Sequence, residues 1–211
     1  MTKPSSDIAF TPSVKAFQTA RGSREAYAKQ EARGGFNTVI DEHLAEFLTE
    51  IDTAYLATSN AAGQPYAQHR GGPKGFIRVI DAQTIGFADY AGNRQYVSTG
   101  NLADNDRAFL FLMDYAGRTR LKIYARVESV ALEADAALTR LVTVPGYKAR
   151  LERIFRVQLE AFDWNCPQHI TPRFTQEEVA EAVRQLRERL SDLEKETADL
   201  RARLASQDAA S

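Results

Sequence analysis

The sequence predicts a mainly β fold with helices (α+β), in which six or seven mostly antiparallel strands form a small closed barrel. Short apolar and aromatic runs alternate with turn residues at short spacing through the middle of the chain. A polar, helix-favouring stretch precedes these runs, and a heptad pattern follows them. We therefore expect a helical arm over 1–36, a barrel over 37–174 and a long helix with its tail over 175–211.

The first part of the chain is polar and is interrupted by Gly22, Gly34 and Gly35. Residues 13–33 are rich in Ala, Gln, Glu, Lys and Arg, which favour helix, but contain few apolar residues. Two interpretations stay open: an arm that packs on another element or subunit, and a free, disordered arm.

A helix over 41–51 opens the barrel part. Asp41 is placed to cap it, and apolar residues recur behind it at helical spacing. Alternating runs separated by turns then predict hairpins. The strands are expected at 53–58, 66–70, 76–81, 84–90, 107–115, 118–130 and about 153–162, with another helix at about 133–142.

The tail is different in character, because its apolar residues follow a heptad repeat. They are Val179, Val183, Leu186, Leu190, Leu193, Leu200 and Leu204, with Thr197 in the one weak position. Thr175 and Glu178 form a capping box at the start. The narrow seam predicts a coiled-coil helix that pairs with another helix, and one amphipathic helix lying on the barrel is the alternative.

Composition excludes several classes of protein. The 211 residues carry a net charge of −1, which argues against a general nucleic-acid binder. No apolar run approaches the roughly 20 residues of a membrane span, and the N-terminus does not resemble a signal peptide. The single cysteine, Cys166, excludes an internal disulfide and favours the cytoplasm, and the three histidines lack metal-site spacing.

Two basic, glycine-rich turns at 70–75 and 91–94 flank a predicted hairpin. Arg70 and Lys74 lie in the first turn, and Asn93 and Arg94 in the second. Glycine lets a backbone approach a ligand closely, and guanidinium and ammonium groups bind phosphate oxygens. If Asn93 caps a short helix, free N–H groups can also face an anion. The pattern indicates a phosphate cradle without a Walker loop; ordinary hairpin turns with solvated charges are the alternative.

These motifs, taken in order, resemble the pyridoxamine 5′-phosphate oxidase-like flavoproteins, which are FMN-binding split barrels. The matching pieces lie at 54–58, 63–65, 70–72, 74–76, 87–90, 92–94 and 101–105. Residues 163–170 resemble a signature of one bacterial branch of that family. The resemblance implies a six-stranded antiparallel FMN-binding split barrel and a homodimer with two FMN molecules in grooves between the subunits.

Carried over by position, the resemblance implies that Arg70, Lys74 and Arg94 hold the FMN phosphate. Asn93 stands where a serine is common, and Gln95 where a lysine is common, which removes one charge. Ser98 lies one turn along the short helix and is expected to reach the phosphate as well.

The other site residues implied by the resemblance surround the flavin itself. Those flanking the isoalloxazine and ribityl chain are Gly75, Phe76, Asp89 and Tyr90. Trp164 and Gln168 are expected to close the site from the other subunit, although a buried core tryptophan is the alternative for Trp164. Cys166 is expected to be an inert small hydrophobe.

The resemblance implies an FMN-dependent oxidoreductase that acts on a small molecule, with NADH or NADPH as a plausible donor. No catalytic acid, base or nucleophile stands out. The C-terminal arginine and histidine motif that binds pyridoxamine phosphate is not visible, so that substrate is not implied. A flavin-binding or sensing protein whose C-terminal helix mediates assembly, and a barrel that binds F420 or haem, are the alternatives.

Overall fold

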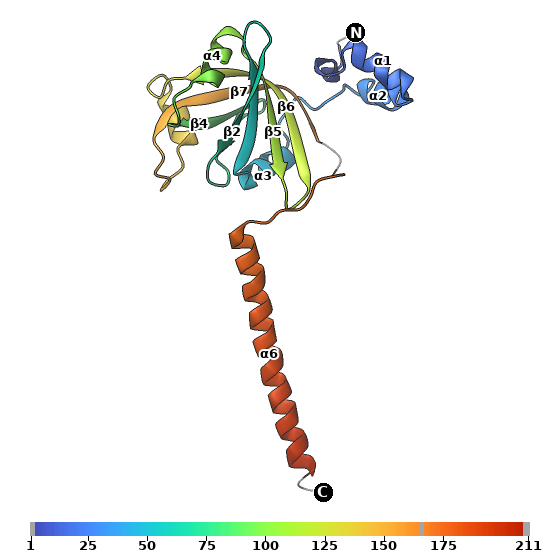
Figure 1. Ribbon diagram of the computed structural model, residues 1–211, viewed down its shortest axis with the longest axis vertical. Coiled ribbons are helices and arrows are strands. Elements are labelled where there is room, and N and C mark those ends of the chain that lie inside the picture. Colours follow the sequence, from blue (N-terminus) through green and yellow to red (C-terminus); the bar gives the residue numbers. More distant parts are fainter. Residues whose placement is uncertain (1–2, 165–166, 209–211) are drawn as a thin grey trace. The chain divides into compact units, whose positions relative to one another are not determined.

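The computed structural model describes residues 3–164 and 167–208. The chain divides into two compact units, Met1–Asp114 with Arg118–Ile170, and Tyr115–Gly117 with Thr171–Ser211. The first unit contains one antiparallel sheet of seven strands in the order β2-β1-β5-β6-β7-β4-β3 (Figure 1). The sheet therefore has one strand more than the six of the implied family barrel.

The strands agree with the sequence prediction except at one end. Their bounds are β1 Thr53–Ser59, β2 Pro65–Gly71, β3 Arg78–Asp81, β4 Thr84–Tyr90, β5 Arg107–Asp114, β6 Thr119–Val130 and β7 Leu151–Trp164. The strand expected from residue 76 begins instead at Arg78. Phe76 belongs to a turn, in which its N–H donates to the carbonyl of Pro73 at 3.0 Å.

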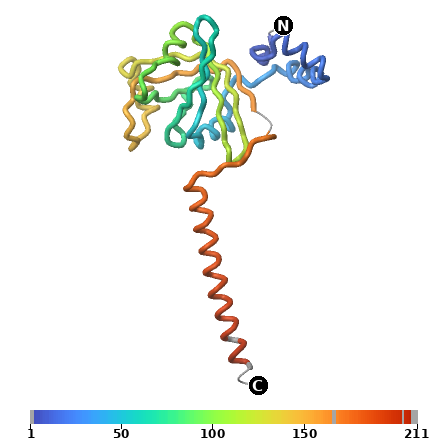
Figure 2. The backbone as a smooth tube through the Cα atoms, viewed as in Figure 1, coloured from blue at the N-terminus to red at the C-terminus, as the bar shows by residue number. Residues whose placement is uncertain are grey.

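The sheet curls strongly but is not closed by hydrogen bonds (Figure 2). Among the described strands, no ladder joins the two edges, β2 and β3. The segment between them contains Pro73, which has no N–H to donate to a ladder, and Gly75, whose φ is 71°. The expectation of a closed barrel was therefore wrong, and the barrel is split at this point.

Seven helical segments accompany the strands in the described chain. They are η1 Ser5–Ile8, α1 Pro12–Ala20, α2 Arg24–Glu31, α3 Glu42–Glu50, α4 Val97–Asp104, α5 Ala136–Val142 and α6 Gln176–Asp208. As predicted, Asp41 caps α3 by accepting from the N–H of Leu44 at 2.8 Å. Helix α5 begins later than expected because Asp135 caps it, accepting from Leu138 N–H at 2.9 Å.

The predicted role of Asn93 as a helix cap was wrong. Helix α4 begins only at Val97, and its N-cap is Tyr96, whose backbone is left-handed with a φ of 54°. The Asn93 side chain instead accepts from the N–H of Gln95 at 3.2 Å and closes a local turn. Arg94 is also left-handed, with a φ of 63°, so the helix cannot extend back through this segment.

The main core lies inside the curled sheet and against α3. Leu44 and Leu48 of α3 are buried there, together with Leu110 of β5 and Phe155 of β7. A smaller cluster packs α5 on the outer side of the sheet, through Leu138, Val142, Ala88, Val130 and Ile154. Strand β4 is consequently buried on both faces, and its first six residues, 84–89, are all buried.

The N-terminal arm is helical and packs on the barrel. Phe10 contacts Phe36 at a ring-centroid distance of 5.3 Å, and Phe36 stacks on Tyr124 of β6 at 6.0 Å. The Ser5 hydroxyl donates to the carbonyl of Phe36 at 2.5 Å. The arm therefore packs on another element of the same chain.

Helix α6 starts at the predicted capping box. Thr175 N–H donates to the Glu178 carboxylate at 2.7 Å, and Glu178 N–H donates to the Thr175 hydroxyl at 3.1 Å. Its seam residues, from Val179 to Leu204, are exposed. Among the described helices, none is long and apolar enough to cross a membrane.

Candidate functional site

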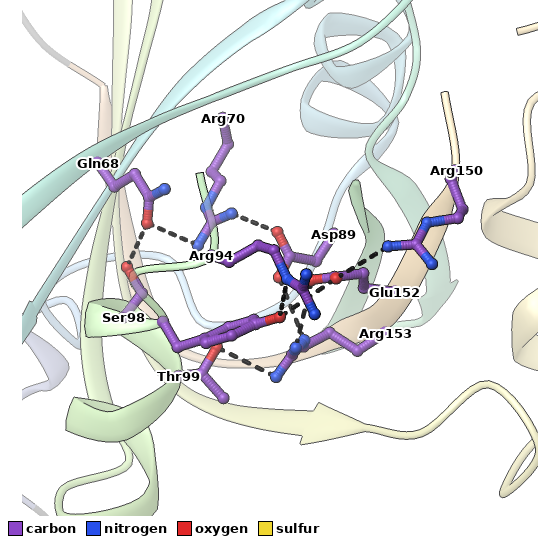
Figure 3. A network of polar contacts seen from close by, with 10 residues as sticks. Gln68, Arg70, Asp89, Arg94, Ser98, Thr99, Arg150, Glu152 and Arg153 are labelled. Atoms are coloured by element: carbon purple, nitrogen blue, oxygen red, sulfur yellow. Dashed lines mark hydrogen bonds and ion pairs between the residues drawn. The ribbon is translucent and has the colours of Figure 1, made fainter. Parts of the chain in front are cut away.

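Residues from β2, β4, α4 and β7 line a small cavity of about 190 Å³ in the first unit (Figure 3). The lining residues are Gln68, Arg70, Asp89, Tyr90, Gly92, Asn93, Arg94, Tyr96, Ser98, Thr99 and Glu152. Six of them are site residues that the sequence predicted: Arg70, Asp89, Tyr90, Asn93, Arg94 and Ser98. We call this cavity the arginine pocket.

Arg70 is held in place from three sides. Its guanidinium forms an ion pair with Asp89, donates to the Gln68 amide oxygen at 2.9 Å, and lies 4.9 Å from the ring centroid of Phe155. Its side chain is only 12% exposed. The group is therefore pre-oriented and would lose little rotamer freedom on binding an anion.

Ser98 is the second residue of α4 and is buried. Its hydroxyl donates to the Gln68 amide oxygen at 2.8 Å, the same oxygen that accepts from Arg70. Gln68 therefore links the start of the helix to the guanidinium of β2, two elements that are far apart in sequence. The sequence analysis did not identify Gln68, although its alternation with Arg70 along β2 places both on one face.

A second arginine faces Asp89 from β7. Arg153 Nε lies 3.4 Å from Asp89 Oδ2, and the Arg153 guanidinium lies 4.9 Å from the ring centroid of Tyr96. Arg153 Nη1 also donates to the Thr99 hydroxyl at 3.5 Å. The Asp89 carboxylate thus lies between two guanidinium groups, that of Arg70 on β2 and that of Arg153 on β7.

Glu152 adds a second carboxylate at the rim of the arginine pocket. It accepts from the Tyr96 hydroxyl at 3.3 Å and from Arg150 at 3.4 Å. The Tyr96 hydroxyl also accepts from Arg94 Nε at 3.5 Å. Glu152 and Arg153 lie more than 50 residues from the predicted motif, so nothing in the local sequence pattern marked them.

Two buried donors in this network are unsatisfied. Arg70 Nε and Arg153 Nε have no hydrogen-bond partner among the described residues, although Arg153 Nε keeps its 3.4 Å ion-pair contact with Asp89. Buried polar groups are normally paired, and functional sites are where exceptions concentrate. The donor set is therefore suited to an additional acceptor such as a phosphate oxygen.

Burial sets the acid–base properties of the central ion pair. It raises the pKa of the Asp89 carboxyl, while the charges of Arg70 and Arg153 oppose that shift. Burial also lowers the pKa of the Arg70 guanidinium, which nevertheless stays charged at neutral pH, as arginine does in proteins. Because the folded-state pKa of Asp89 is raised, its contribution to stability is greatest below the unfolded-state pKa. That contribution is lost as pH rises through the folded-state pKa.

We expect Asp89→Asn to strengthen anion binding in the arginine pocket at neutral pH by on the order of tenfold, or about 1.4 kcal/mol. The reason is that the carboxylate would compete with an anion for Arg70 and Arg153. Calorimetric titration with sulfate, which keeps its charge over the range, measures this. In the wild-type chain, sulfate affinity should rise as pH falls towards the pKa of Asp89. A pH dependence that is unchanged in the Asn variant would contradict this role of Asp89.

Several predicted site residues lie outside the arginine pocket. Lys74 forms an ion pair with Glu50 at 3.3 Å and its side chain is 54% exposed. Phe76 is buried in the core against Phe87, and Gly75 lies against the carbonyl of Thr49. Lys74, Gly75 and Phe76 are therefore not among the residues that line the arginine pocket with Arg70. Gln95 is exposed beside the pocket and is not among its lining residues.

Trp164 and Gln168 are also separate from the arginine pocket. Trp164 is half-buried beside the main core, with its ring 4.6 Å from His43 and 4.9 Å from Phe47 of α3. Gln168 is exposed. Within one chain, Trp164 therefore packs on α3. This position is nearer to the alternative interpretation, that of a buried core tryptophan. Residues 165–166, and with them the prediction for Cys166, lie outside the described residues.

A larger hollow of about 590 Å³ adjoins the arginine pocket. Thr99 lines both. The other lining residues are Leu102, Ala103, Asp106, Arg126, Val127, Glu128, Ser129, Arg156 and Gln158. This hollow combines apolar walls with polar groups at its rim. Within the described residues, no cluster of three or more histidine, cysteine, aspartate or glutamate residues could hold a metal ion.

The sequence of the chain matches the model of a known protein family. Residues 40–159 match the model of the pyridoxamine 5′-phosphate oxidase family. The chain belongs to this family. The matched segment covers α3 and all of the sheet up to Leu159 of β7, so it contains most of the arginine pocket. It thereby confirms the split-barrel class predicted from the sequence.

Three of the solved structures similar to this chain are between 15% and 19% identical to it. A protein from Clostridium acetobutylicum related to general stress protein 26 of B. subtilis (pyridoxinephosphate oxidase family) is 15% identical. The match covers 66% of this chain and 99% of that one, with a TM-score of 0.42. HutZ, the haem storage protein of Vibrio cholerae, is 17% identical. The match covers 58% of this chain and 92% of that one, with a TM-score of 0.39. An F420 reductase is 19% identical. The match covers 59% of this chain and 98% of that one, with a TM-score of 0.40. No curated protein matches the chain.

Proposed function

We propose that this member of the pyridoxamine 5′-phosphate oxidase family binds FMN and acts as an oxidoreductase on a small molecule. The observation that supports this proposal is the charge balance of the arginine pocket. Arg70, Arg94 and Arg153 contribute three guanidinium groups around it, against the two carboxylates of Asp89 and Glu152. The excess positive charge and the unsatisfied guanidinium donors suit a phosphate monoester.

The sizes of the two hollows suggest how FMN would be divided between them. The arginine pocket, at about 190 Å³, is smaller than the roughly 300–1,000 Å³ typical of cofactor sites. It suits the phosphate end. The adjoining hollow of about 590 Å³, with Leu102 and Val127 on its walls, suits a flat aromatic ring system. Thr99 lies at the junction of the two.

The residues of the chain would hold the cofactor, and the bound flavin would supply the redox chemistry. Arg70 and Arg153 would neutralise the phosphate, and the buried hydroxyl of Ser98 would orient it from the start of α4. The N–H groups of the first turn of that helix add a favourable dipole. Lys74 would join only after releasing Glu50, and that exposed ion pair is weak enough to exchange.

The remaining parts of this proposal concern assembly and location. We propose a cytoplasmic homodimer with FMN at the subunit interface, without nucleic-acid or membrane partners. Trp164 and Gln168 would then approach the flavin from the second subunit. Both lie after the middle of β7, on the part of the chain that leaves the barrel.

The first experiment is an absorbance spectrum of the full chain after incubation with FMN and gel filtration. We expect flavin absorbance to co-elute with the protein, and anaerobic addition of NADH or NADPH to bleach it. A bound flavin that neither donor reduces would favour a non-catalytic carrier. A colourless protein would contradict FMN binding, and parallel incubations with haem and F420 would test those two ligands.

A further inference from the structure

We propose that α6 pairs with α6 of a second copy of this chain, in parallel and in register, as a two-stranded coiled coil. The helix presents seven apolar side chains along one seam, and all of them are 37–70% exposed. They are Val179, Val183, Leu186, Leu190, Leu193, Leu200 and Leu204. Exposed apolar residues that recur in a strict heptad need a matching surface, and an identical helix supplies one.

The charges of α6 divide into two groups by position. Several on the side away from the seam pair within the helix: Arg184 contacts Glu181 and Glu188, each at 2.6 Å. The charges that flank the seam behave differently. In the part of the chain that the structure describes, Arg189, Glu194, Glu196 and Arg201 form no ion pair.

In a parallel, in-register pair, residues flanking the seam on one helix face those five positions further along on the other. Arg189 then faces Glu194 of the second helix, and Glu196 faces Arg201 of the second helix. These four charges are neutralised, each pair occurring twice by symmetry, whereas Arg187, which also flanks the seam, faces Ala182. This complementarity identifies a second α6, rather than an unrelated helix, as the partner.

Thr197 decides between parallel and antiparallel pairing. An antiparallel pair with full overlap would match as many charges, because Arg187 would face Glu194 and Arg189 would face Glu196. It would, however, place Thr197 against Leu186 of the other helix and Arg201 against Ala180. The parallel pair places Thr197 against Thr197, so the one polar seam position forms its own layer. The threonine hydroxyl already donates to the carbonyl of Leu193 at 2.7 Å, so it needs no further partner.

The seam also has room for an opposing side chain at this level. A hollow of about 370 Å³ lies along it, because the small side chains of Thr197 and Ala198 follow the larger Leu190 and Leu193. A parallel partner helix would insert its own seam residues here, as knobs enter holes in coiled coils. A polar seam position of this kind favours one register over others at some cost in stability.

Cysteine cross-linking of the full chain tests the proposal directly. In a Cys166→Ser background, which removes the only natural cysteine, Leu186→Cys should form a covalent dimer under mild oxidation. Ala202→Cys is the matched control, because Ala202 lies on the face away from the seam. We expect at least a tenfold faster cross-link for Leu186→Cys. Equal rates for the two variants, or no cross-link at residue 186, would overturn the proposal.

Mixing experiments test the orientation and the charges. If Leu186→Cys chains cross-linked mainly with Thr197→Cys chains, the pair would be antiparallel and the parallel arrangement wrong. The double variant Glu194→Arg/Glu196→Arg should lose cross-linking at residue 186, because each new arginine faces another arginine. Adding chains with Arg189→Glu/Arg201→Glu should restore it as a mixed dimer. Unchanged cross-linking in the charge variant would show that these four residues do not guide pairing.

Discussion

Phe155→Ala is expected to lower the free energy of unfolding by about 3–5 kcal/mol, the usual cost of emptying a buried aromatic site. The side chain is fully buried on β7, and its ring lies 5.5 Å from that of Phe87 on the neighbouring strand. For a chain of this size, such a loss lowers the melting temperature by roughly 6–20 °C. Thermal and urea unfolding of purified protein would measure it.

Phe155 also supports the site, which allows a sharper version of the experiment. The Arg70 guanidinium lies over its ring, so Phe155 connects the core with the arginine pocket. Phe155→Leu retains most of the apolar volume but removes the aromatic face. We expect it to cost much less stability than alanine while still weakening anion binding. Equal stability losses in the two variants would mean that packing volume at this position matters little.

Arg70→Ala is expected to weaken FMN binding by about 2–3 kcal/mol, because it removes one or two charge-assisted hydrogen bonds to the phosphate. This corresponds to roughly a 30- to 150-fold higher dissociation constant. Fluorescence titration with FMN measures the change. Binding of riboflavin, which lacks the phosphate, should change far less, so the pair of ligands locates the effect at the phosphate end.

The control for this variant is Arg24→Ala in the N-terminal arm. Arg24 is also a partly buried arginine paired with a carboxylate, Glu31, but it lies outside the arginine pocket. Its loss should leave FMN affinity unchanged. The Arg70→Ala protein could keep both the wild-type melting temperature and the wild-type dissociation constant for FMN. That result would show that Arg70 does not hold the phosphate.

The charges at the centre of the arginine pocket balance one another within the chain. Asp89 is a buried carboxylate between Arg70 and Arg153, so it neutralises the guanidiniums when no anion is bound. A phosphate would compete with it for the same two groups. This competition lowers the affinity that the arginines alone would provide, and it makes binding depend on the protonation of Asp89.

Local patterns in the sequence were sufficient for most elements. The alternation over 53–59 and 107–130, the cap at Asp41 and the capping box of Thr175 and Glu178 all appear as predicted. Each depends on neighbours within a few residues, so the physical cause is contained in the segment itself. The heptad repeat of α6 is likewise complete in the sequence, and the prediction that it pairs remains to be tested.

Tertiary structure decided what the sequence left open. The sequence by itself determined the strands, the long helix and the candidacy of Arg70, Asp89, Arg94 and Ser98. Only the fold brought Arg153 beside them and left Lys74 outside the pocket, paired with Glu50. The reason is that the order of strands places β7, which carries Arg153, next to β4, which carries Asp89. Such placements depend on long-range pairing, which no local pattern of residues encodes.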